Sequence, residues 1–324
     1  MSGALLSVTV LLLSSLAVLG IVVVVAAIFL TRGRRSASAD RNATPPAAMA
    51  LLQAARRKAI FAIALASTVC VVLFMTGIAA HSLLGLPFLL AAPIASTAGL
   101  LLYTATRPAL YAFEPDEVRH ASLAPRRPTA YVSFRTVAGP LAVLVALIVF
   151  VVFAGMTASI DDLGLSRAVA FATESRSSRS SPYAGWFYGI PLLAACVALA
   201  AATAAALWRI SAAPALPGGA LAGVDDAWRR ETLKVVSAIS VFAMALPLGG
   251  AAAISGMSTL NAFFEGVPEG WQAVGIGLVT GGAALIVTAF VSIALATRRA
   301  IALPAKSIAA GRTPEPLATA RGDL

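Results

Sequence analysis

The densest group of ionisable residues in this chain is Glu114-Pro-Asp-Glu-Val-Arg-His120. Glu117 and His120 are three residues apart, which is the spacing that helices of di-metal carboxylate bundles use to hold their metal ions. Such a site needs a second copy of the pair on a facing helix, and the sequence offers none. We interpret the stretch as a solvated charged loop, and we predict neither a metal ion nor another cofactor.

The remaining chemistry-bearing residues are equally isolated. Asp161 and Asp162 could form an acid pair for hydrolysis, but adjacent side chains on a turn diverge, which favours a hydrophilic loop or a helix cap. Cys70 and Cys196 each lie near the middle of an apolar segment, where a cysteine is usually a small inert hydrophobe. No His or Lys is placed to activate a serine or threonine within these segments. The sequence therefore predicts no catalytic residue and no enzyme.

The amino-acid composition accounts for the scarcity of candidate catalytic and metal-binding residues. The chain has 324 residues, of which 59% are hydrophobic and 12% are charged, whereas soluble domains carry about a quarter of charged residues. Its mean hydropathy is +0.89. These values exclude a soluble enzyme, a secreted disulfide scaffold and a disordered polypeptide. A protein that crosses a membrane several times remains.

Seven apolar segments are long enough to cross a bilayer as helices, which takes roughly 20 residues each. None of them contains an acidic residue, a basic residue or histidine. The sequence thus predicts an all-α bundle of seven transmembrane helices, followed by a disordered cytoplasmic tail over residues 304–324. The predicted spans are residues 4–30, 59–80, 87–106, 137–156, 187–207, 235–254 and 272–297.

The distribution of basic residues predicts the orientation of these spans. If the N-terminus lies outside, the cytoplasmic segments 31–58, 107–136, 208–234 and 298–324 hold 21 of the 24 Lys and Arg residues. This asymmetry is what the positive-inside rule expects, and it places the C-terminus inside. The outer loop then contains Glu174-Ser-Arg-Ser-Ser-Arg-Ser-Ser-Pro182, which we interpret as a low-complexity hydrophilic tract.

The basic excess also bears on partners and localisation. The arginines lie beside the ends of spans, so we predict contact with anionic lipid headgroups at the inner face, and no nucleic acid partner. Lysine is rare beside arginine and alanine is abundant, which is typical of a GC-rich bacterial genome. We therefore expect a multi-pass protein of a bacterial plasma (inner) membrane, with protein subunits as further candidate partners.

Small residues and prolines suggest how the helices pack and bend. Small side chains let helix backbones approach closely, and the seventh span contains a G-x-x-x-G motif. A proline beside glycines is a candidate hinge. The predicted packing residues are Gly275, Gly277, Gly281, Gly282, Ala198, Ala202 and Ala206, and the predicted hinge consists of Pro247, Gly249 and Gly250.

The hypotheses about function depend chiefly on the absence of ionisable residues from the predicted spans. Ionisable residues inside a membrane usually mark transport or proton pathways, and the predicted spans contain none. The leading hypothesis is a non-catalytic accessory, scaffold or regulatory membrane component. The alternative is a permease or transporter subunit for a neutral or lipophilic solute, and a membrane-embedded enzyme ranks third. The permease would line its cavity with Ser96, Thr97, Thr203 and Thr280.

Overall fold

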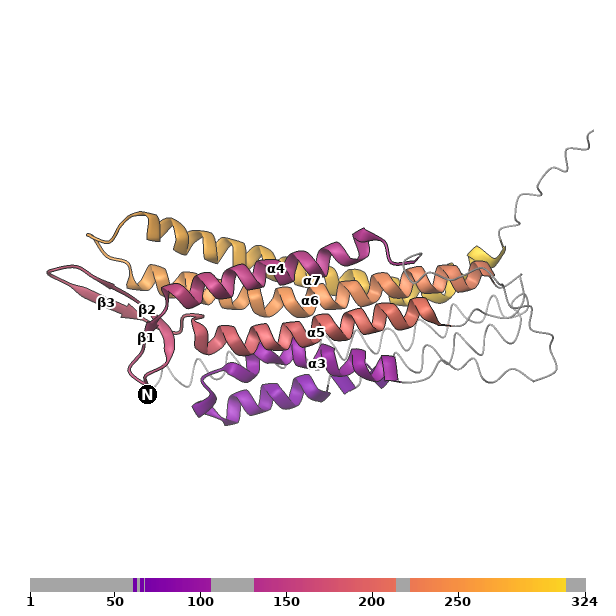
Figure 1. The fold of residues 1–324 in the computed structure, drawn as a ribbon, viewed down its shortest axis with the longest axis horizontal. Coiled ribbons are helices and arrows are strands. Elements are labelled where there is room, and N and C mark those ends of the chain that lie inside the picture. Colours follow the sequence, from indigo (N-terminus) through magenta and orange to yellow (C-terminus); the bar gives the residue numbers. More distant parts are fainter. Residues whose placement is uncertain (1–60, 63–64, 67, 106–130, 214–221, 313–324) are drawn as a thin grey trace, which may run out of the picture. The chain divides into compact units, whose positions relative to one another are not determined.

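The computed structural model describes residues 61–62, 65–66, 68–105, 131–213 and 222–312. The predicted first span and the Glu114–His120 stretch lie outside the described residues. The described part is mostly helical, which confirms the predicted helical fold class. Its elements are a helix over Thr68–Ala79, the 3-10 helix η1 (His81–Leu83), α3 (Leu86–Ala105), α4 (Phe134–Thr157), β1 (Ser159–Ile160), β2 (Ser166–Ala172), β3 (Ser177–Ser180), α5 (Trp186–Ala212), α6 (Ala222–Ala262) and α7 (Gly270–Arg312) (Figure 1).

Within the described residues, five helices, α3 to α7, are long and apolar enough to cross a membrane. Helices α3, α4 and α5 match the predicted spans 87–106, 137–156 and 187–207 closely. Helix α6 has 41 residues, which at 1.5 Å per residue gives about 60 Å, roughly twice the thickness of the hydrocarbon layer. The apolar span 235–254 is therefore only the central part of a longer helix.

Helix α7 is also longer than its predicted span. It passes Pro304 and ends at Arg312, so its last turns, residues 304–312, fall within the segment 304–324 that is predicted as a tail. These residues are rich in alanine, which has the highest helix propensity, and they prolong a helix that is already formed. The remainder of that predicted tail, residues 313–324, lies outside the described residues.

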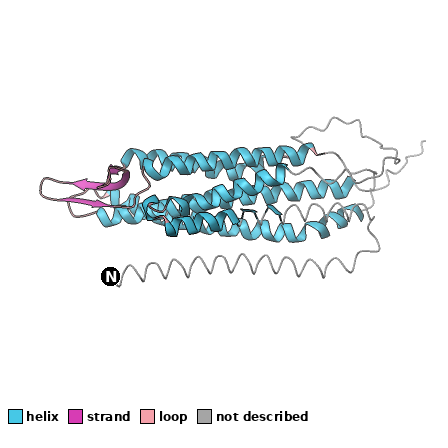
Figure 2. Cartoon of the chain, turned by 90° about the horizontal axis from the view of Figure 1, so that it is seen from below, coloured by secondary structure: helices cyan, strands magenta, loops and turns pink. Residues whose placement is uncertain are grey.

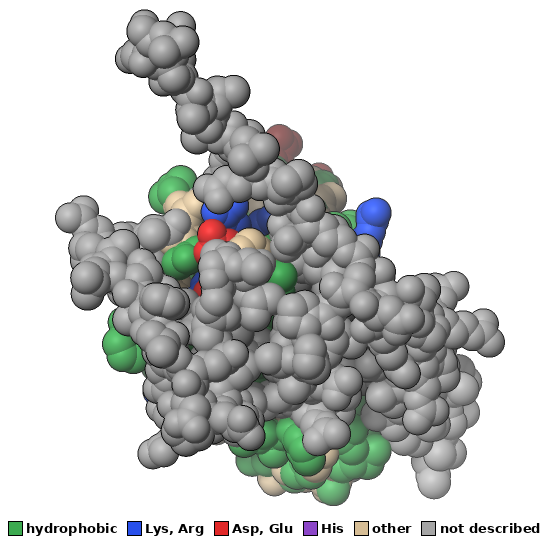
Figure 3. Space-filling view, turned by 90° about the vertical axis from the view of Figure 1, so that its right-hand side faces the viewer, with side chains coloured by type: hydrophobic (Ala, Val, Ile, Leu, Met, Phe, Trp, Pro, Cys, Tyr) green, Lys and Arg blue, Asp and Glu red, His purple; other side chains and the backbone are tan. Residues whose placement is uncertain are grey.

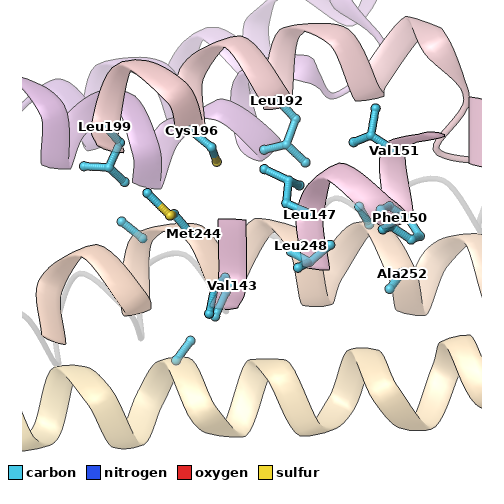
Figure 4. Close-up of a cluster of buried hydrophobic side chains, with 14 of the residues drawn as sticks. Val143, Leu147, Phe150, Val151, Leu192, Cys196, Leu199, Met244, Leu248 and Ala252 are labelled. Atoms are coloured by element: carbon cyan, nitrogen blue, oxygen red, sulfur yellow. The ribbon is translucent and has the colours of Figure 1, made fainter. Parts of the chain in front are cut away.

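The hydrophobic core lies where α4, α5 and α6 pack together. Its fully buried members include Leu147 from α4, Leu192 and Cys196 from α5, and Met244 and Leu248 from α6. Figure 4 shows these side chains converging from the three helices. Interdigitation of this kind leaves few voids large enough for water. Apolar side chains thus fill the space between α4, α5 and α6.

A small antiparallel sheet, in the order β1-β2-β3, follows α4 and precedes α5 in the chain and lies at one end of the helix bundle (Figure 2). Val169 of β2 pairs with Ser180 of β3, and Ala172 pairs with Ser177. The tract Glu174–Pro182, interpreted from sequence as merely hydrophilic, therefore contains a strand. Its serines adopt extended backbone because β2 supplies partners for their peptide groups. We call this end of the bundle the sheet end.

The end of the bundle away from the sheet carries the charged part of α6. Asp225, Arg229, Arg230 and Lys234 occupy the first turns of that helix, before its apolar section begins. Viewed from this side, basic and acidic side chains reach the surface among the described residues (Figure 3). Charge is thus concentrated outside the apolar middle section of α6.

Candidate functional site

At the sheet end, a buried carboxylate organises the turn between β1 and β2. One oxygen of Asp161 accepts hydrogen bonds from the backbone N–H groups of Leu163 (2.8 Å) and Leu165 (2.9 Å). The other oxygen forms an ion pair with Arg167 on β2. Burial acts to raise the pKa of Asp161, but the hydrogen bonds from Leu165, Arg167 and Leu163 outweigh it, so the pKa lies below its ordinary value.

The same arginine links the sheet to two other segments. Partial burial acts to lower the pKa of Arg167, but its interactions with Tyr188 of α5 and with Asp161 outweigh that effect and raise it. The hydroxyl group of Tyr188 donates a 2.7 Å hydrogen bond to the carbonyl oxygen of Leu84, which lies in the turn before α3. Two connections that are distant in sequence, around residues 84 and 167, are therefore joined through Tyr188.

Helix α6 holds the segment that follows β3. The hydroxyl oxygen of Ser255 accepts a 2.9 Å hydrogen bond from the backbone N–H of Ala184, and Ser258 donates a 2.6 Å hydrogen bond to the carbonyl oxygen of Pro182. Tyr183, between them, is fully buried and shares a 2.6 Å hydrogen bond with Thr157 at the end of α4. Polar groups of this segment are thus satisfied by helices on either side.

The hairpin formed by β2 and β3 also packs on the connection between α6 and α7. The guanidinium carbon of Arg176 lies 4.8 Å from the ring centre of Phe264. The rings of Phe171 and Trp271 meet edge to face with their centres 5.2 Å apart. We refer to Asp161, Arg167, Arg176, Tyr183 and Tyr188 together as the sheet-end clamp. It joins three interhelical connections.

The four residues predicted to line a cavity are distributed over three helices. Thr97 of α3 donates to the carbonyl oxygen of Pro93, and Thr280 of α7 donates to that of Ile276 and is exposed. Thr203 of α5 is buried and shares a 2.7 Å hydrogen bond with Ser240 of α6. Ser96 of α3 is half-buried. Each threonine hydroxyl is thus bonded to its own helix or to a neighbouring one.

The predicted packing residues of the seventh span divide into two faces. A β-carbon on Gly275 would lie 3.3 Å from the carbonyl oxygen of Gly256, and one on Gly282 would lie 2.6 Å from that of Gly249. Gly277 and Gly281, the G-x-x-x-G pair, have open space at the same position. Helix α7 therefore packs on α6 through Gly275 and Gly282, and the motif faces away from that contact.

The other predicted packing and hinge residues lie as follows. Ala202 and Ala206 of α5 are buried, whereas Ala198 is exposed because a four-residue step drifts around the helix. Pro247 lies inside α6, which continues through it as one helix. Gly249, placed in the predicted hinge, is in close contact with α7, while Gly250 has open space around it.

At the opposite end, Arg229 is the largest fully buried side chain among the described residues, with 1% of its surface exposed. Its guanidinium group forms an ion pair with Asp225 and donates hydrogen bonds to the carbonyl oxygens of Ile210 (2.9 Å) and Ser211 (3.1 Å). Those carbonyls belong to the last turn of α5, where helical partners are lacking. Arg229 of α6 thus caps α5. In the sequence, this arginine is distinguished only as one basic residue in the predicted cytoplasmic segment 208–234.

Several of the described charged residues form ion pairs with one another. Among the described residues, no three His, Cys, Asp or Glu side chains come together as metal ligands. Asp161 and Asp162 diverge, as expected for neighbours in a turn, and each forms a separate ion pair, with Arg167 and Arg179 respectively. Cys70 and Cys196 are both free thiols.

Comparison of the chain with protein-family models, curated proteins and solved structures gives no match.

Proposed function

We propose that this chain is a seven-span protein of a bacterial inner membrane and acts there as a non-catalytic accessory, scaffold or regulatory component. The sheet end faces the outside and the charged end of α6 faces the cytoplasm. The proposal is supported most by the way in which polar groups are used. The threonine hydroxyl groups of the predicted cavity are bonded to the protein's own helices, and the space between α4, α5 and α6 is filled by apolar side chains.

The two ends of the bundle support the same proposal. The sheet-end clamp joins three connections between helices, and Arg229 fastens the end of α5 to α6. Transporters that work by alternating access rock one group of helices against another. Ties at both ends oppose such rocking, which favours a fixed scaffold. The basic residues near the far end of α6 favour a cytoplasmic location for that end.

One observation favours the permease alternative. Each of the four helices α3 to α6 contains a proline in its interior, at Pro93, Pro140, Pro191 and Pro247. Interior prolines remove a backbone hydrogen bond and bend helices, and transporters use such bends. The permease hypothesis requires a solute path between these helices, where Leu147, Leu192 and Leu248 are fully buried.

A paired experiment separates the two functions. The full chain is cross-linked in membranes of its native host and purified in mild detergent, and the purified chain is reconstituted alone in liposomes for uptake of a panel of neutral solutes. The scaffold proposal expects a stoichiometric membrane partner and no uptake above that of empty liposomes. A monodisperse chain without a partner, together with saturable uptake that Leu147→Trp abolishes, would establish the permease instead.

A further inference from the structure

The turn between β1 and β2 reverses the usual arrangement of polar and apolar side chains. Its carboxylate Asp161 is 9% exposed, whereas Ile160 and Leu163 are each 63% exposed. A turn surrounded by water normally does the opposite, since exposing large apolar side chains forgoes about 25 cal/mol per Å² of apolar surface. The reversed arrangement is expected of a surface that is covered by something apolar.

The apolar surface of the turn continues that of a helix. The face of α4 that no other described helix covers carries Val145, Val149, Val152 and Met156, all exposed, and Met156 lies one residue before the end of the helix. Ile160 and Leu163 follow directly. In the proposed membrane protein this face of α4 contacts lipid, so lipid is also the nearest apolar cover for the turn.

A tryptophan at the same end of the bundle indicates where the membrane boundary is expected relative to the turn. Trp186 begins α5 and its ring lies against Gly155 of α4, where any larger residue would collide with it. Tryptophan rings favour the boundary between headgroups and acyl chains. Ile160 follows Gly155 by five residues, so the chain keeps it within about 17 Å of that level. The turn therefore follows within a few residues of a position that favours the interface.

The turn is rigid enough to hold its apolar side chains outward. Asp161 accepts hydrogen bonds from two backbone N–H groups within the turn, and its own N–H donates to the carbonyl oxygen of Leu165 over 2.8 Å. Gly164 has a φ of 76°, which a glycine adopts at little cost. The exposed carboxylate of Asp162 pairs with Arg179 of β3 and is therefore directed toward the hairpin.

We propose that the turn Ser159–Leu165 is an interfacial anchor, which inserts Ile160 and Leu163 among the lipid headgroups and upper acyl chains of the leaflet at the sheet end. This goes beyond the proposed function and uses only its membrane location. The anchor fixes the height of the sheet above the acyl chains and complements the tryptophans of the same end.

The test uses the full chain in nanodiscs of phosphatidylcholine and phosphatidylglycerol, with Cys70→Ala and Cys196→Ala as background. A fluorophore is attached to Leu163→Cys or Ile160→Cys. Two matched controls carry the same label: Val149→Cys on the exposed face of α4, and Ser177→Cys, exposed on β3. Quenching is measured with iodide in water and with phosphatidylcholine bearing a nitroxide either just below the headgroup or deep in the acyl chain.

We expect the Leu163 and Ile160 labels to be quenched best by the shallow nitroxide and several-fold less by iodide than the Ser177 label. Iodide quenching equal to that at Ser177 would overturn the anchor, because the turn would lie in water. Protection from both quenchers would also overturn it, in favour of a covering protein. If the Val149 label escaped the deep nitroxide, the membrane location and the anchor would fail together.

Discussion

Gly249 of α6 and Gly282 of α7 are in mutual close contact: a β-carbon on Gly249 would lie 2.7 Å from the carbonyl oxygen of Gly282, and one on Gly282 would lie 2.6 Å from that of Gly249. Gly256 and Gly275 repeat the arrangement at the next position. The two contacts are seven residues apart on each helix, which is the repeat of helices that pack along a continuous seam. The α6–α7 pair therefore depends on backbone approach that side chains would prevent.

We predict that Gly249→Ala and Gly282→Ala each destabilise the protein by about 1–3 kcal/mol, because the added methyl group meets backbone that cannot rotate away. Thermal unfolding in detergent, followed by circular dichroism, measures the change. The controls are Gly277→Ala and Gly281→Ala, which have open space and should leave the melting temperature unchanged or slightly raised. Equal losses at all four positions would contradict the α6–α7 contact.

The stability of the sheet end should depend on pH through Asp161. Its pKa is lower in the folded state, so its stabilising effect is complete above the pKa of an unfolded aspartate, about 3.9, and is lost as the pH falls through the folded value. The hydrogen-exchange protection factors of residues 159–185, which correct for the intrinsic pH dependence of exchange, should fall over this acidic range. Asp161→Asn should abolish the acid-dependent step, whereas Asp162→Asn, at an exposed carboxylate, should retain it.

Removal of the buried guanidinium group should be costly. We expect Arg229→Met to destabilise the protein by about 3–5 kcal/mol, because Asp225 and the last carbonyl groups of α5 lose a partner while buried. The neighbouring Arg230→Met is the matched control: its ion pair with Asp226 is exposed and 4.0 Å long, so the loss should stay within about 1 kcal/mol. Chemical unfolding in mixed micelles compares the two, and similar losses would rule out the capping role of Arg229.

The proposed orientation makes a separate prediction about labelling in whole cells. A cysteine at Ser177 should react with a maleimide that cannot cross membranes, and a cysteine at Lys234 should react only after the cells are opened. Both side chains are exposed, so burial does not account for the difference. Labelling of the Lys234 position in intact cells would reverse the proposed topology.

The sequence predicted the apolar helices well because lipid-facing helices need unbroken apolar runs, and α3, α4 and α5 end near where those runs end. It did not predict how far α6 extends. The charged residues from Asp225 to Lys234 belong to the predicted cytoplasmic segment 208–234, and the burial of Arg229 against α5 is seen only in the structure.

Strand β3 could not have been predicted from local pattern. Ser177–Ser180 has no alternation of apolar and polar residues, and its extended backbone comes from pairing with β2. Likewise, G-x-x-x-G spacing identifies small residues but not the face on which they lie, and Gly277 and Gly281 prove to face away from α6. Both features depend on partners that are remote in sequence.

The attachment of α7 has a consequence for how the chain tolerates mutation. The buried residues of this helix, among those whose side chains the structure describes, recur at every seventh position. In a library that covers every substitution in α7, larger side chains should therefore be rejected at positions spaced seven residues apart. The positions between them should accept most apolar replacements and should vary freely among related sequences. The four intolerant positions are Gly275, Gly282, Ala289 and Ala296.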